Sequence, residues 1–77
     1  MHSRAIRENG EKPIKFTDGK KLPGKPGYHK LLRWSETGMK SQVSGERVTL
    51  EWCQVGYARA TSKEAMERFQ ERINGGA

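Results

Sequence analysis

The 77-residue sequence lacks most of the residues that enzymes and metalloproteins depend on. Its single cysteine, Cys53, excludes an intramolecular disulfide and suits a reducing compartment. Its two histidines, His2 and His29, lie far apart, and no CxxC or HExxH pattern is present, so no zinc site is indicated. The glycines around Lys25 lack the spacing and the Ser or Thr of a phosphate-binding loop. We therefore expect no enzyme activity, no cofactor and no metal site, and we expect Cys53 to be an inert thiol.

Long apolar runs are missing as well. No run approaches the roughly 18 apolar residues of a membrane-spanning helix, and residues 1–4 are not followed by the apolar stretch of a secretory signal. Hydrophobic residues make up only 32% of the chain, and a domain of this size buries only about 60% of its unfolded surface. These observations predict a cytoplasmic protein with no membrane partner, and a core too small to leave room for a small-molecule substrate.

What the sequence has in excess is positive charge. Lys and Arg number 15 against nine Asp and Glu, which gives a net charge of +6. Residues 1–40 hold ten of the basic residues and four of the acidic ones, whereas residues 41–77 hold five of each. A clustered basic field is typical of proteins that contact nucleic-acid phosphates, although a merely solvated basic surface has the same composition.

The predicted organisation has two parts. Residues 1–14 are polar and without periodicity, so we expect a flexible basic arm that either follows DNA phosphates or is a frayed terminus. The remaining pattern predicts one folded domain over residues 15–74. At its start, residues 16–22 predict a short helix with Thr17 or Asp18 as the N-cap. Its apolar residues, Phe16 and Leu22, are expected to face inward.

Residues 28–37 predict an amphipathic helix that Gly38 ends. Apolar and small residues at spacings of three and four share one side, namely Tyr28, Leu31, Trp34 and Ser35. Basic residues share the other side, namely His29, Lys30 and Arg33. A helix of this kind can pack on one side and enter a nucleic-acid groove with the other.

The second half of the sequence predicts a β-hairpin. Residues 39–46 form a polar loop, and residues 47–52 alternate between polar and apolar, as a half-buried strand does. A turn at residues 54–56 and a returning strand at residues 57–60 complete the hairpin.

A final helix is predicted from a capping box, in which the Thr61 hydroxyl and the Glu64 carboxylate satisfy each other's amides. Glu64 and Arg68 are spaced as an ion pair on this helix, which ends near Asn74. Its expected buried stripe consists of Ala65, Met66, Phe69 and Ile73.

Two segments resemble a known family. Residues 28–34, with Leu-x-Arg-Trp at their end, resemble the recognition helix of excisionase-like and MerR-like winged helix-turn-helix proteins. Residues 49–51 (TLE), the Val55-Gly56 turn and residues 61–69 (TSKEAMERF) resemble the wing and closing helix of short bacterial proteins of that kind. The resemblance implies an α+β fold, specifically a small winged helix-turn-helix with a β-hairpin wing and a C-terminal helix. It also implies sequence-specific binding of double-stranded DNA, as a recombination directionality factor or a small transcriptional regulator. Further partners would be a recombinase or neighbouring copies of the protein on DNA.

The residues expected to contact base edges are His29, Lys30 and Arg33, because a recognition helix presents its exposed side to the major groove. For Arg33 the alternative is a salt bridge to Glu36 or Glu51, and for His29 it is an ordinary exposed histidine.

Other residues are expected to hold the DNA backbone. Lys20, Lys21 and Lys25 flank the predicted turn and are interpreted as phosphate ligands, or otherwise as solvated lysines. In the wing, the residues expected to touch DNA are Gln54, Tyr57 and Arg59.

Two other functions fit the same charge. The first is binding of RNA or the ribosome, with Tyr28, Trp34 and Trp52 as stacking surfaces, although the pattern favours both tryptophans as core residues. The second is a protein-interaction module of a mobile element.

Overall fold

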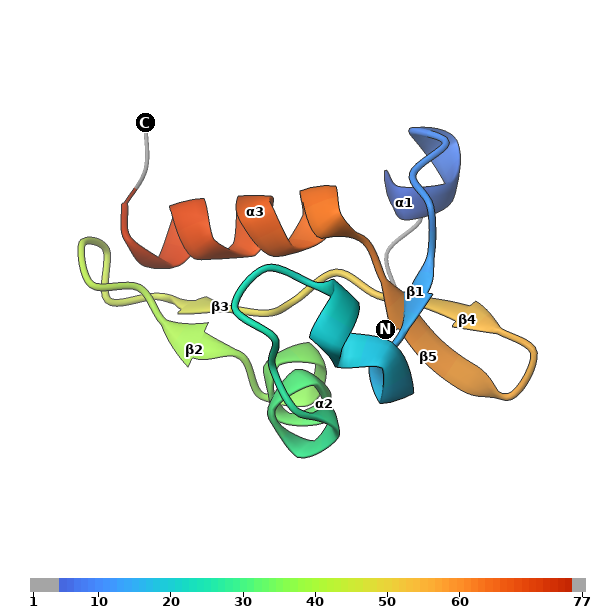
Figure 1. Cartoon of the computed structure of the whole chain (residues 1–77). Coiled ribbons are helices and arrows are strands. Elements are labelled where there is room, and N and C mark those ends of the chain that lie inside the picture. The colour runs from blue at the N-terminus through green and yellow to red at the C-terminus, as the bar shows by residue number, and fades with distance from the viewer. Residues whose placement is uncertain (1–4, 76–77) are drawn as a thin grey trace.

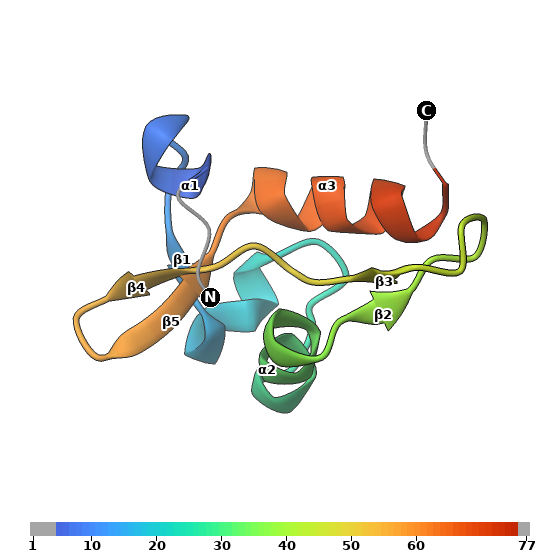
Figure 2. The ribbon, with the colours of Figure 1, turned by 180° about the vertical axis from the view of Figure 1, so that it is seen from behind.

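The computed structural model describes residues 5–75 and shows an α+β fold (Figure 1). In chain order its elements are α1 (Ala5–Glu8), β1 (Ile14–Lys15), the 3-10 helix η1 (Phe16–Lys21), α2 (Tyr28–Glu36), β2 (Met39–Lys40), β3 (Arg47–Val48), β4 (Cys53–Val55), β5 (Ala58–Thr61) and α3 (Lys63–Ile73). Helix α3 runs along one side of the molecule and α2 lies on the other, with β3 and the segment after it between them (Figures 1 and 2). None of the helices within residues 5–75 is long and apolar enough to cross a membrane.

The larger sheet has three antiparallel strands in the order β1-β5-β4. Strand β5 is central: Thr61 pairs with Ile14 of β1, and Ala60 pairs with Cys53 of β4. Val55 pairs with Ala58, so a two-residue loop closes the β4–β5 hairpin. The predicted hairpin is therefore present, but its strands are shifted, because Cys53–Val55 form β4 and the turn expected at residues 54–56 is the loop of Gly56 and Tyr57.

A second, two-stranded sheet pairs β2 with β3, and Met39 pairs with Val48. The predicted strand over residues 47–52 is wrong in extent, because only Arg47–Val48 is paired. The Leu50 amide instead donates a hydrogen bond to the Trp34 carbonyl at the end of α2, at 2.9 Å. The backbone thus leaves the sheet to contact the helix, and the expected loop before it contributes β2 to the small hairpin.

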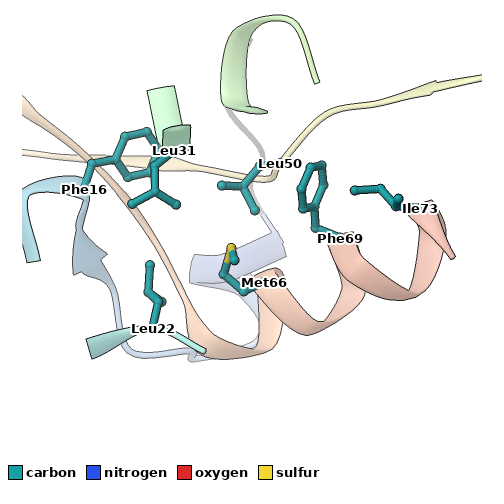
Figure 3. Packing of buried hydrophobic residues seen from close by; sticks show 7 residues of the cluster. All are labelled: Phe16, Leu22, Leu31, Leu50, Met66, Phe69 and Ile73. Atoms are coloured by element: carbon teal, nitrogen blue, oxygen red, sulfur yellow. The ribbon is translucent and has the colours of Figure 1, made fainter. Parts of the chain in front are cut away.

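Most of the core forms between α3, α2, η1 and the segment after β3 (Figure 3). Its buried members are Phe16, Leu22, Leu31, Leu50, Met66, Phe69 and Ile73. The inward positions predicted for Phe16 and Leu22, and the stripe predicted for the last helix, are confirmed. Trp34 and Trp52 are partly buried and pack against this cluster, and the Trp34 ring lies 5.3 Å from that of Phe69.

Helix α2 has the two sides that the sequence predicts, except that Tyr28, expected on the packed side, is exposed. Leu31 and Ser35 are buried, and the residues expected on the outer side are exposed. After the helix, Gly38 has φ 78°, and a Cβ at this position would lie 2.1 Å from the Val48 carbonyl oxygen. The chain therefore turns from α2 into β2 through a close backbone contact that only glycine fits.

The start of α3 differs from the predicted capping box by one residue. Ser62, not Thr61, is the N-cap, and its hydroxyl accepts a hydrogen bond from the Ala65 amide at 2.9 Å. Thr61 is still paired in β5, and its hydroxyl donates to the Glu51 carbonyl at 2.8 Å. Because the strand runs to Thr61, the helix cannot begin there.

The short helix η1 also starts differently from the prediction. Its N-cap is Lys15, in extended conformation, and no side chain caps it, so neither Thr17 nor Asp18 has that role. The reason is that β1 runs directly into η1 without an intervening loop.

The segment before β1 is attached to the domain, which differs from the flexible arm expected for residues 1–14. Ile6 is fully buried in a second apolar cluster with Cys53, Ala60 and Ala65. Glu11 is held by Arg68 of α3, 57 residues away in sequence. The Ile6 side chain and the Glu11–Arg68 ion pair thus anchor this polar segment to the domain. Residues 1–4 of the expected arm lie outside the described residues.

Candidate nucleic-acid interface

The exposed side of α2 forms one wall of a groove, and the β2–β3 hairpin forms the other. The groove is lined by His29, Lys30, Arg33, Trp34, Thr37, Gly38, Met39 and Arg47. The three residues predicted from the sequence to contact base edges are therefore brought together on one concave surface. Trp34 forms its apolar floor, and the Lys30 Nζ lies 5.8 Å from the centroid of the Trp34 ring.

The cations of this groove are free of internal salt bridges. Glu36 pairs with Arg59 and Glu51 pairs with Arg68, so neither neutralises Arg33. Within residues 5–75, Lys30 and Arg33 form no salt bridge at all. Lys30 and Arg33 are both exposed, so no acidic side chain within residues 5–75 neutralises either charge.

His29 is exposed beside Tyr28, and the two rings meet edge to face with their centroids 5.6 Å apart. Tyr28 is 47% exposed at the first turn of α2, although its spacing predicted a place on the buried side. Both rings are therefore accessible at the N-terminal end of the helix.

Arg47 is a member of the groove that sequence reasoning missed. It lies on β3, opposite α2, and its Nη1 is 3.5 Å from the carbonyl oxygens of Thr37 and Gly38. The predicted strand over residues 47–52 gave no reason to place Arg47 next to α2. The pairing of β2 with β3 immediately after the helix creates that proximity.

The lysines expected to hold phosphates are exposed and divided between two places. Lys20 and Lys21 lie on η1, and Lys25 lies in the loop before α2, where it has φ 47°. Lys21 lines a separate hollow beside β1, together with Lys12 and Lys15. The predicted phosphate ligands therefore do not form one cluster.

Two of the predicted wing residues lie at the β4–β5 hairpin tip. Tyr57 is fully exposed in the two-residue loop, and it lines a hollow with Tyr28 of α2. The Gln54 side-chain amide donates to the Gly56 carbonyl at 3.2 Å. Its backbone carbonyl accepts a hydrogen bond from the Arg7 guanidinium.

Arg59, the third predicted wing residue, is engaged within the protein. Its Nη1 lies 3.3 Å from a carboxylate oxygen of Glu36 and 3.1 Å from the Ser35 hydroxyl, both on α2. Its guanidinium lies over the Trp52 ring, 4.3 Å from the centroid. The side chain therefore connects the hairpin to α2 and does not extend from the tip.

The most buried charges lie away from the groove. Arg68 donates to Glu11 at 2.7 Å and to Glu51 at 2.8 Å, and the side-chain exposures are 29%, 6% and 13% respectively. The hydrogen bonds from Arg68, assisted by Ser62 and Asn9, lower the pKa of Glu11 from 4.5 to about 2, against the opposing effect of burial. The same contacts raise the pKa of Arg68 above its ordinary range. This cluster replaces the pair expected between Glu64 and Arg68.

Residues 5–75 hold no group of three or more His, Cys, Asp or Glu side chains placed to bind a metal ion. Cys53 is a free, buried thiol. Compared with known proteins, the chain matches no protein-family model, no curated protein and no solved structure.

Proposed function

We propose that the protein binds double-stranded DNA as a small winged helix-turn-helix protein. In this proposal, η1 and α2 are the two helices of the helix-turn-helix, α2 is the recognition helix and the β4–β5 hairpin is the wing. The observation that carries the proposal is the exposed side of α2, where Lys30 and Arg33 line a groove with Arg47 and pair with no acidic residue of the described part of the chain.

The arrangement of the elements supports this assignment. A short helix, a turn and a second helix follow one another, and the β4–β5 hairpin comes after the small β2–β3 sheet. A Cβ on Gly19 of η1 would lie 2.2 Å from the Pro26 carbonyl oxygen, so η1 packs closely on the turn before α2. Helix α2 lies on the outside of the molecule, opposite α3, where a duplex can reach it (Figures 1 and 2).

In this proposal, the side chains on the exposed side of α2 contact the bases. Arg33 can donate two hydrogen bonds to guanine O6 and N7, a contact that discriminates against other bases by about 1–3 kcal/mol. Lys30 can contact a base or a phosphate, and His29 is placed one residue nearer the N-terminus. Arg47 reaches the same groove from β3 and adds a charge for the phosphates along its edge.

The DNA backbone is held by the surroundings of α2. Lys20 and Lys25 precede the helix in sequence, and Tyr57 offers a hydroxyl at the hairpin tip. Contacts of this kind position a protein on DNA without reading its sequence. Arg59 has a different role in the proposal, because its contacts with α2 fix the hairpin relative to the recognition helix.

The biological setting follows only from the family resemblance of residues 28–34 and 49–69. On that basis we propose that the protein is a recombination directionality factor or a small transcriptional regulator, acting with a recombinase or with neighbouring copies of itself. A domain of this size covers a single half-site, so such partners would also supply affinity.

The test is a fluorescence anisotropy titration of labelled random-sequence duplex at about 50 and about 200 mM salt, because phosphate contacts weaken steeply over this range. The proposal expects binding at the lower salt and a loss of at least tenfold at the higher one, equal to about 1.4 kcal/mol. If the folded protein does not bind duplex at the lower salt concentration, the proposal is wrong. Binding to single-stranded RNA alone, with quenching of Trp34 or Trp52 fluorescence, would favour the RNA alternative.

A further inference from the structure

A second group of cations lies beside β1, outside the groove of α2. Lys12, Lys15 and Lys21 line one hollow together with Pro13, Ile14 and Asp18. Three positive charges thus surround a space that holds one negative charge. Within residues 5–75, none of these three lysines forms a salt bridge, with Asp18 or with any other acid.

The backbone under these lysines is fixed on both sides. Before Lys12, the Glu11 carboxylate accepts hydrogen bonds from Arg68 and from the Ser62 hydroxyl, the latter at 2.6 Å. After it, Lys15 pairs with Ala60 in the sheet. The lysines are therefore held near one another although they repel, and an anion bound among them would relieve that repulsion with little further ordering of the backbone.

The geometry of η1 separates this hollow from the surface next to α2. Asp18 and Lys21 line the lysine hollow, whereas Thr17 lines the hollow between α2 and the hairpin tip. The backbone of η1 is kinked at Asp18, between these two surfaces. The helix η1 thus lies between the lysine hollow and the hollow next to α2, and one nucleic-acid backbone could contact both in succession.

We propose that Lys12, Lys15 and Lys21 form a second phosphate-binding site, for the DNA backbone that flanks the segment contacted by α2. The inference rests on the proposed function, because it assumes a duplex already bound at α2. It also assigns the segment before β1 a role as a fixed part of the interface. In a helix-turn-helix complex the first helix crosses the backbone, and the lysine site continues that path beyond η1.

The experiment compares two duplexes, one of about 10 base pairs, or one helical turn, and one of about 20 base pairs. The readout is the slope of log K against log salt. A longer duplex multiplies the available binding positions and so raises the affinity, but it steepens the slope only if more phosphates are contacted. Wild type is compared with the double variant Lys12→Gln, Lys15→Gln and with Arg72→Gln, an exposed charge at the C-terminal end of α3.

The inference expects wild type to show a steeper slope on the long duplex than on the short one. The double variant should lower the long-duplex slope by about 2 and leave the short-duplex slope unchanged, since each lost phosphate contact removes about 0.9. Arg72→Gln should change neither slope. Equal slopes for wild type and the double variant on the long duplex, with binding intact, would overturn the second site alone. No binding of wild type to either duplex would overturn the proposed function as well.

Discussion

Arg59 of β5 and Glu36, the last residue of α2, form a salt bridge of 3.3 Å, and the Arg59 guanidinium also lies over the Trp52 ring. The contact joins the hairpin to the helix that carries the exposed basic residues. A cation that sequence reasoning assigned to DNA is thereby used inside the protein.

Arg59→Ala should therefore lower the free energy of unfolding by about 1 kcal/mol, because a partly exposed salt bridge and a cation–π contact each contribute modestly. Urea denaturation measures this loss. The salt slope of DNA binding should stay within error of wild type, since no phosphate contact is removed. A shallower salt slope for the folded Arg59→Ala variant than for wild type would instead show that Arg59 contacts a phosphate.

The charge cluster at the N-terminal half of α3 predicts a larger effect on stability. Arg68→Met leaves the Glu11 carboxylate buried without its main partner. Breaking a buried ion pair from one side costs about 3–5 kcal/mol, which is a large part of the total stability of a domain this small. Thermal or urea unfolding should show the loss, whereas Arg72→Met, on an exposed position of the same helix, should stay within about 0.5 kcal/mol of wild type.

The pH dependence of stability should report on Glu11. Its pKa is lowered from 4.5 to about 2 in the folded state, chiefly by hydrogen bonds from Arg68. A lowered pKa stabilises the fold above the unfolded value, so the contribution is complete above about pH 4.5 and is lost as the pH falls toward 2. The shift corresponds to about 3 kcal/mol. Urea midpoints between these pH values should fall more steeply for wild type than for Glu11→Gln, and parallel curves would contradict the assignment.

The close backbone contact in the turn after α2 predicts that Gly38→Ala, which adds a single methyl group, lowers the stability of the fold. Gly38→Ala would place its Cβ 2.1 Å from the Val48 carbonyl oxygen, at φ 78°. Gly24→Ala is a matched control, since Gly24 has φ 80° and nothing lies within 4 Å of its Cβ position. The control should cost about 1 kcal/mol for the left-handed backbone alone, and Gly38→Ala should cost more, because β2 and β3 must also move. Equal losses in calorimetry would show that the close contact is unimportant.

The helices that sequence reasoning located best have strong periodicity. The exposed side of α2 and the stripe of Ala65, Met66, Phe69 and Ile73 on α3 follow from residue spacing alone. On the packed side of α2 the spacing locates Leu31 and Ser35 correctly but not Tyr28, which is exposed at the first turn. The α+β class follows from the same helices together with the alternating residues of the second half. The apolar side of an amphipathic helix is buried whichever element packs against it, so residue spacing predicts the buried side without knowledge of that element.

Tertiary contacts between distant residues could not be predicted in this way. Ile6 is a single apolar residue in a polar segment, and Glu11 meets Arg68 across 57 positions. Strands of two residues, such as β1 and β3, are too short to show alternation. In the candidate site, the exposed face of α2 could be predicted. The position of Arg47 could not, because it depends on the two-residue pairing of β2 with β3. The position of Arg59 depends on its salt bridge with Glu36 of α2.

The most direct test of the account compares Arg33→Ala with Arg72→Ala in DNA binding. Both arginines are exposed in the last turn of a helix, so the two substitutions remove the same charge from equivalent positions on α2 and α3. With both variants folded by circular dichroism, the account predicts that Arg33→Ala weakens duplex binding at least tenfold, or about 1.4 kcal/mol, while Arg72→Ala binds as wild type. Equal affinities of the two variants would contradict the assignment of α2 as the helix that contacts DNA.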